Sequence, residues 1–186
     1  MRIIFLALIA FSTLSLDAQT ITVYVKDRAP VGPVDLSRGM AKAAELLCPA
    51  GIQIRWHRGE PSSQNRDFGR LILVWIVSGV PDGKRPETLA FAQAYEGVHL
   101  TILYDRVSQI MPELPQIVLG YVLAHEITHL LEGISRHSDT GVMKAGWNRT
   151  DIFAMRRGRL VLSSEDLDLI HRGMERRQLA LVASAH

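Results

Sequence analysis

The sequence predicts an α/β (α+β) fold in which helices pack on one mixed, twisted β-sheet. Short segments rich in β-branched residues alternate with segments that repeat apolar residues at helical spacing. The predicted order is strand, helix, three strands and helix, followed by a further helical part. The chain of 186 residues contains one cysteine, so no internal disulfide can form and packing must hold the core together.

The first half of the chain supplies one helix and three strands. Residues 21–25 are mostly β-branched and predict the first strand. Asp35 or Ser37 is expected to cap a helix whose apolar residues recur on one side. Residues 52–56 alternate apolar and polar side chains, which predicts a half-buried second strand. The continuous apolar run 71–77 predicts a strand that is buried on both faces.

The second half supplies one more strand and two helices. Residues 79–88 contain two prolines and two glycines and predict a connection. Alternation over residues 98–104 predicts the fourth strand, and a long apolar helix is expected over residues 116–132. Near the C-terminus, Ser163 or Ser164 is expected to cap a helix. Its inner side is formed by Leu167, Ile170, Met174 and Leu181.

The N-terminal residues 1–18 predict a secretory signal peptide. Arg2 carries a positive charge, residues 3–16 are predominantly apolar, and Ala18 offers a small residue for cleavage. The apolar run is shorter than the roughly 20 residues that span a bilayer, so we expect no stable membrane insertion after cleavage. This interpretation predicts a secreted or periplasmic protein in which residues 19–186 form one domain.

Charge and cysteine content narrow the classes of partner and site. The formal net charge is +2, and removal of residues 1–18 leaves it unchanged because one basic and one acidic residue are lost. Without a run of basic residues, the chain lacks the electrostatic signature of a protein that binds nucleic acid. The single cysteine, Cys48, lies among Leu46, Leu47 and Pro49, which predicts a buried structural thiol.

The strongest functional signal is the run His-Glu-Ile-Thr-His at residues 125–129. His125 and His129 are four residues apart in a predicted helix, so both imidazoles can reach one metal ion. Glu126 points about 100° away round the helix, where it can contact water near the metal without being a ligand. This is the spacing of the H-E-x-x-H zinc peptidases. A surface helix with two fortuitous histidines is the alternative, and the apolar flanking residues argue against it.

A catalytic zinc site of this kind needs a third protein ligand. Gly133 can end the helix in a left-handed conformation and turn the chain back, and His137 follows four residues later. Met143 comes shortly afterwards. A glycine turn, a third histidine and a downstream methionine resemble the metzincin clan of zinc peptidases. The run from Ala124 to Trp147 also looks like a group of uncharacterised exported bacterial proteins with the same spacing.

The resemblance to metzincins implies a sheet with the active-site helix packed on it. It also implies one catalytic Zn²⁺ held by His125, His129 and His137, with Met143 in a tight turn beneath these ligands. The spacing departs from the clan, which places the glycine seven and the third ligand ten residues after the first histidine, whereas here the intervals are eight (to Gly133) and twelve. The resemblance therefore leaves the subfamily open.

Two residues compete with His137 as the third ligand. Asp139 could ligate zinc if the wider turn places it nearer to the metal. Glu165, in the predicted C-terminal helix, would correspond to the glutamate ligand of gluzincin peptidases, although acids in a first helical turn are also favoured by the helix dipole. His99 could face substrate from the strand before the active-site helix, and a partly solvated strand histidine is the alternative.

These residues predict a secreted zinc metallopeptidase that acts on a peptide or protein. Zinc lowers the pKa of a water to about 7 and polarises the scissile carbonyl, and Glu126 acts as general base and then acid. A non-catalytic, zinc-stabilised binding module and a zinc hydrolase of a non-peptide amide are the alternatives. The presence of Glu126 favours catalysis, because a structural zinc site has no use for that carboxylate. The sequence does not specify the oligomeric state.

Overall fold

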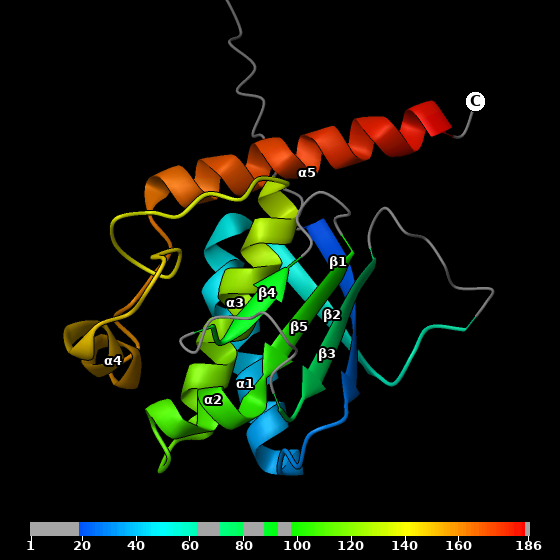
Figure 1. The fold of residues 1–186 in the computed structure, drawn as a ribbon. Coiled ribbons are helices and arrows are strands. Elements are labelled where there is room, and N and C mark those ends of the chain that lie inside the picture. The colour runs from blue at the N-terminus through cyan, green and yellow to red at the C-terminus, as the bar shows by residue number, and fades with distance from the viewer. Residues whose placement is uncertain (1–18, 63–70, 80–87, 93–97, 185–186) are drawn as a thin grey trace, which may run out of the picture.

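The structure is a computed structural model that describes residues 19–62, 71–79, 88–92 and 98–184. The predicted signal peptide at residues 1–18 and most of the predicted connection at 79–88 lie outside these ranges. Apart from one short 3₁₀ turn, the elements follow the order β1-α1-β2-β3-β4-β5-α2-α3-α4-α5 (Figure 1). The α/β class predicted from the sequence is confirmed.

One mixed sheet contains all five described strands, in the order β2-β1-β3-β5-β4. β1, β2, β3 and β5 run parallel, and β4 pairs with β5 in the antiparallel direction. β4 is at the end of the sheet and was not expected, because Ala-Phe-Ala carries little strand signal. The strand bounds are Gln19–Asp27 for β1, Ile52–Arg58 for β2, Leu71–Val77 for β3, Ala90–Ala92 for β4 and His99–Leu103 for β5.

The sheet buries one face against the helices. Alternate residues of β1, β3 and β5 on this face are at most 2% exposed, whereas their neighbours on the opposite face are at least partly accessible, except for the buried Leu71 and Leu103 at strand ends. The prediction that β3 is buried on both faces is wrong, because Trp75 is 37% exposed. His99 contacts Trp75 edge to face, with the ring centroids 6.0 Å apart. His99 therefore lies on the face turned away from the helices.

Helices α1 (Pro33–Leu47) and α3 (Pro115–Glu132) pack closely against each other on the sheet. A Cβ atom on Gly120 would lie 2.5 Å from the Cβ of Lys42 and 3.0 Å from the carbonyl oxygen of Gly39. Glycine is therefore required where the two helix backbones approach most closely. This contact fixes the position of α3 relative to the sheet.

Helix α5 (Ser164–Ser184) crosses the C-terminal end of α3, along the top of the molecule in Figure 1. A Cβ atom on Gly173 would lie 1.9 Å from the carbonyl oxygen of Leu131, so the two backbones are in direct contact. The predicted cap at Ser163 is confirmed, since its hydroxyl accepts a hydrogen bond from the backbone N–H of Asp166. Within the described ranges, none of the helices combines the length and the hydropathy that a membrane span requires.

Several local predictions differ from the structure. The predicted cap of α1 at Asp35 or Ser37 is wrong, because the N-cap is Gly32. Pro33 occupies the first helical position, which proline favours, so Asp35 lies in the first turn of the helix. The fourth predicted strand ends at Leu103, and Tyr104 begins a short helix instead. Cys48 is exposed, not buried, because it starts the 3₁₀ turn after α1 and points away from the core. Two short helices were not predicted, namely α2 (Tyr104–Ile110) and α4 (Arg149–Arg156).

Candidate metal centre

The structure brings the three histidines singled out by the sequence into one cluster. The ligand-type nitrogens of His125, His129 and His137 all lie within 4.8 Å of one another. His125 and His129 are one turn apart on α3, and their Nε2 atoms are separated by 3.1 Å. The His137 ring is 5.4 Å from that of His125 and 4.9 Å from that of His129, measured between centroids.

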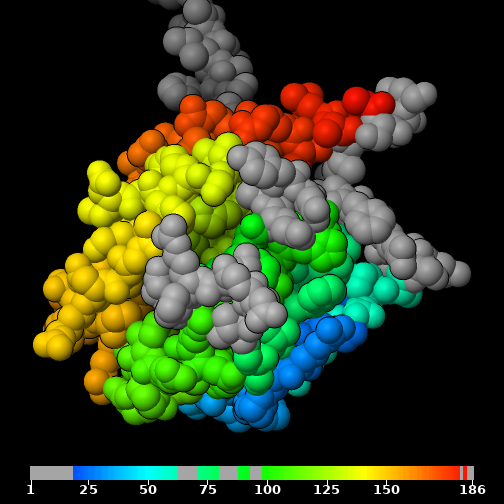
Figure 2. Space-filling view, in the orientation of Figure 1, coloured from blue at the N-terminus to red at the C-terminus, as the bar shows by residue number. Residues whose placement is uncertain are grey.

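His137 reaches the cluster because α3 ends at Gly133. This glycine has φ +66° and its N–H donates to the carbonyl of His129, which closes the last helical turn. The segment that follows brings His137 back to the two histidines of α3. In Figure 2 the yellow surface that follows α3 lies beneath the orange-to-red helix α5. His125 and His129 are buried, whereas His137 is exposed at the mouth of the site.

The donor set and its geometry fit a zinc ion. Zn–N bonds of about 2.0–2.1 Å in a tetrahedron place two ligand nitrogens about 3.3 Å apart, close to the 3.1 Å between the Nε2 atoms of His125 and His129. Burial lowers the pKa of His125 to about 4 and that of His129 to about 3. Burial also lowers the pKa of His137. All three imidazoles are therefore neutral near pH 7 and have lone pairs available for a metal.

The orientation of His125 is fixed by the turn that contains Met143. Nδ1 of His125 donates to the carbonyl of Val142 at 2.8 Å, which leaves Nε2 as the metal-facing nitrogen. Met143 follows in the same turn and is completely buried. Nδ1 of His129 has no hydrogen bond of standard geometry within the described residues. The backbone of Ile134 nevertheless interacts with the His129 ring and opposes part of the fall in its pKa.

Glu126 is next to the cluster and is only 8% exposed. Burial raises the pKa of its carboxyl to about 8, so the group is mostly protonated in the metal-free protein at neutral pH. A cation nearby would favour the ionised form and oppose this shift. A carboxyl placed in this way is suited to accept and return a proton.

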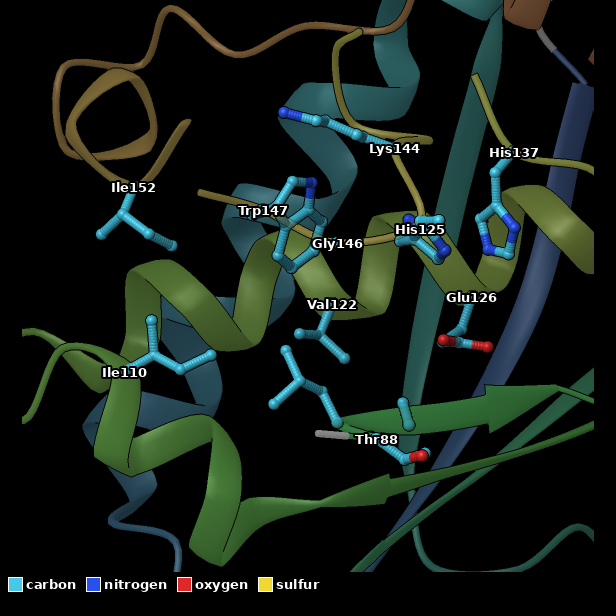
Figure 3. Close-up of a pocket in the computed structure, with 13 residues that line it drawn as sticks. Thr88, Ile110, Val122, His125, Glu126, His137, Lys144, Gly146, Trp147 and Ile152 are labelled. Atoms are coloured by element: carbon cyan, nitrogen blue, oxygen red, sulfur yellow. The ribbon is translucent and has the colours of Figure 1, made fainter. Parts of the chain in front are cut away.

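A pocket of about 590 Å³ opens onto these groups and is lined by His125, Glu126 and His137 on one side. The other side is mostly apolar, and Trp147 also contacts His125 edge to face at 5.6 Å. Figure 3 shows His125, His137 and Glu126 on one side of this pocket and Trp147, Val122 and Ile110 on the other. The large apolar lining residues are Leu89, Ile110, Val122, Trp147 and Ile152.

The other residues that the sequence proposed for the site lie elsewhere. The Glu165 carboxylate forms an ion pair with Arg136 at 2.8 Å, and its side chain is 69% exposed. Asp139 is exposed and outside the histidine cluster. His99 lies on the opposite face of the sheet and does not line the pocket.

Lys144 and Trp147 line the pocket but were not identified from the sequence. Lys144 donates to Asp151 at 2.6 Å across seven residues, and Asp151 also completes the capping box of α4 with Asn148. A capping box is readable from sequence, since Asn148 is followed three residues later by an acid. That signal would have located α4, but not the pocket beside it.

The sequence of this chain matches no protein-family profile and no curated protein. Its structure is similar to that of archaemetzincin from Methanopyrus kandleri, with a TM-score of 0.56 and 15% identity over 84% of this chain and 96% of that one. Archaemetzincin from Archaeoglobus fulgidus, solved in complex with malonate, gives a TM-score of 0.52 and 12% identity over 80% of this chain and 99% of that one. The chain therefore has the mixed α/β fold of the archaemetzincins, with a cluster of three histidines.

Proposed function

We propose that this protein is a zinc-dependent metallopeptidase that hydrolyses peptide bonds. The observation that carries the proposal is a cluster of three neutral imidazoles beside a buried carboxyl, at a pocket that His125, Glu126 and His137 line. The likeness in fold to archaemetzincins supports a zinc hydrolase. Glu126 distinguishes the site from a purely structural one, because a structural zinc has all four positions filled and needs no adjacent acid.

His125, His129 and His137 would hold a single Zn²⁺ and leave one position open. Zinc bound there would supply a Lewis acid that activates water and polarises the scissile carbonyl. The Glu126 carboxylate takes a proton from the attacking water and passes it to the nitrogen of the leaving amine.

The substrate in this proposal is an extended peptide segment of a protein outside the cytoplasm. β4 is an edge strand of the described sheet and lies beside the pocket, because its residue Ala90 and the adjacent Leu89 line the cavity. An extended chain could add to such a sheet end through its backbone and place one side chain in the apolar half of the pocket. Export through the signal peptide at residues 1–18 is part of the same proposal.

The test is a peptide-library digest followed by mass spectrometry. Purified residues 19–186 would be assayed as zinc-loaded protein, after treatment with a chelator, and after zinc is restored. The proposal requires cleavage that the chelator abolishes and zinc restores. Bound zinc without cleavage of any peptide would instead support a zinc-stabilised binding module. Cleavage only of non-peptide amides would support a zinc hydrolase that acts on such amides.

A further inference from the structure

Asp166, in the first turn of α5, is a buried carboxylate outside the histidine cluster. Its side chain is 0% exposed, and its two oxygens accept hydrogen bonds from different segments. Oδ2 accepts from the backbone N–H of Ser163 at 2.8 Å, which is an ordinary helix cap. Oδ1 accepts from the hydroxyl of Ser138, which is 28 residues earlier in the chain. Helix capping accounts for the first bond and leaves the second unexplained.

The second bond holds the residues on both sides of His137. Ser138 follows His137 directly, and its hydroxyl also accepts from Arg136 Nη1 at 2.8 Å. The same guanidinium nitrogen lies 3.5 Å from Oδ1 of Asp166, so Arg136 neutralises the buried charge. A buried carboxylate needs such a partner, because its desolvation is otherwise strongly unfavourable. Arg136, Ser138 and Asp166 thus form one closed group, which we name the Asp166 clamp.

The backbone near the clamp is also tied to the turn that orients His125. The N–H of Ser138 donates to the carbonyl of Met143 at 2.8 Å, and Ser138 pairs with Lys144 in a β-bridge. Val142, the neighbour of Met143, accepts the hydrogen bond from His125. The clamp is therefore connected to two of the three histidines by short, defined contacts.

The wide spacing between the histidines explains why such a clamp is useful. The five residues from Gly133 to His137 are not helical, and His137 itself is exposed. Fixing each residue of a flexible loop costs conformational entropy. A loop that is already held in place before metal arrives leaves less of this cost to be met by metal binding.

We propose that Asp166 is a positioning residue of the metal centre, which acts through Ser138 and Arg136 to hold His137 at the zinc site. This inference rests on the zinc site of the proposed function and adds a residue to it. Asp166 does not contact the metal or the substrate. Its effect is on the geometry of the third ligand.

The test measures zinc affinity by competition with a chromophoric chelator, in variants that separate the clamp from the helix cap. Asp166→Asn and Ser138→Ala should each lower zinc affinity by about 10- to 100-fold, the usual effect of losing an outer hydrogen-bond partner of a metal site. Ser138→Thr keeps the hydroxyl and should restore affinity close to that of the wild type. Ser163→Ala removes only the hydrogen bond from the Asp166 N–H to the Ser163 hydroxyl, and Glu165→Gln removes only the ion pair between Arg136 and Glu165. The zinc affinity of both variants should therefore stay close to that of the wild type.

A double-mutant cycle with His137→Ala separates positioning from general stability. If the clamp acts through His137, Ser138→Ala should cause no further loss of zinc affinity once His137 is absent. An equal loss in both backgrounds, or full affinity in Ser138→Ala, would overturn the inference even if Asp166→Asn fails to fold. Wild-type protein that binds zinc and cleaves no peptide would instead overturn the proposed function alone.

Discussion

The Nδ1 atom of His125 donates a hydrogen bond to the backbone carbonyl of Val142, 17 residues further along the chain. The turn that carries Val142 is itself held to the segment before α5, because the N–H of Val142 donates to the carbonyl of Val161 at 3.0 Å. The orientation of the first histidine therefore depends on a turn that lies after the third. This dependence makes the site sensitive to changes outside the ligands themselves.

Gly141→Ala should disturb this turn and lower zinc affinity together with stability. Gly141 has φ +78°, and a Cβ atom there would lie 2.4 Å from the carbonyl oxygen of Val161. Gly158→Ala is the matched control, since Gly158 has φ +65° but an added Cβ would meet nothing within 4 Å. Both variants carry a similar backbone strain, of about 1 kcal/mol, and only Gly141→Ala adds the clash. Zinc titration and urea denaturation of the pair would measure the difference, and equal zinc affinity in both variants would contradict the account.

The identity of the third ligand can be tested with three alanine variants. His137→Ala should lower zinc affinity by more than the roughly 10- to 100-fold typical for an outer partner, because a direct ligand is lost. Asp139→Ala and Glu165→Ala should bind zinc almost as tightly as wild type, since Asp139 is exposed and Glu165 pairs with Arg136. Loss of zinc in Glu165→Ala with retention in His137→Ala would assign the site to the gluzincin type instead.

The residues of the site that depend on local spacing could be predicted from the sequence. His125 and His129 share one side of α3 because helix geometry alone places them there, and Gly133 ends the helix because its backbone tolerates a positive φ. His137 is close in sequence, so its return to the same site needed only a turn. These features depend on fewer than fifteen residues, from 125 to 137.

The features that depend on distant contacts could not be predicted. Asp166 looked like an ordinary acid in the first turn of a helix, because its bond to Ser138 joins residues that are 28 apart. The exposure of Trp75 depends on which face of the sheet the helices cover, and an apolar run does not reveal this. The burial of Cys48 was predicted wrongly from its apolar neighbours. Leu46 and Leu47 are buried at the end of α1, whereas Cys48 begins the 3₁₀ turn that follows and is exposed.

Glu132 should make the stability of the metal-free protein depend on pH. Glu132 is 1% exposed, and neither of its carboxyl oxygens has a hydrogen-bond partner among the described residues. Burial and then Asp166 raise its pKa to about 7, against the opposing effect of Arg136. Because the folded protein holds this proton more tightly than the unfolded chain, the stabilisation is present below pH 4.5 and is lost as the pH rises through about 7.

Glu132→Gln removes this dependence. Its free energy of unfolding relative to wild type should therefore rise between about pH 5 and about pH 8, by on the order of 2 kcal/mol, because each pKa unit corresponds to about 1.4 kcal/mol. Denaturant unfolding of the metal-free proteins at several pH values would measure it. Glu175→Gln, at an exposed position on α5, controls for the loss of one charge. A difference between Glu132→Gln and wild type that stays constant with pH would contradict the prediction.

In the proposed mechanism, a zinc ion bound to the three histidines acts together with Glu126 in peptide hydrolysis. The most direct measurement is kcat/KM of zinc-loaded Glu126→Gln against wild type on one cleaved peptide, with zinc content determined for both. The amide keeps the shape of the side chain but cannot accept the proton of the attacking water. We expect equal zinc content in the two proteins and a fall in kcat/KM of about 10²- to 10⁴-fold in the variant. Undiminished cleavage by Glu126→Gln would show that Glu126 is not the general base.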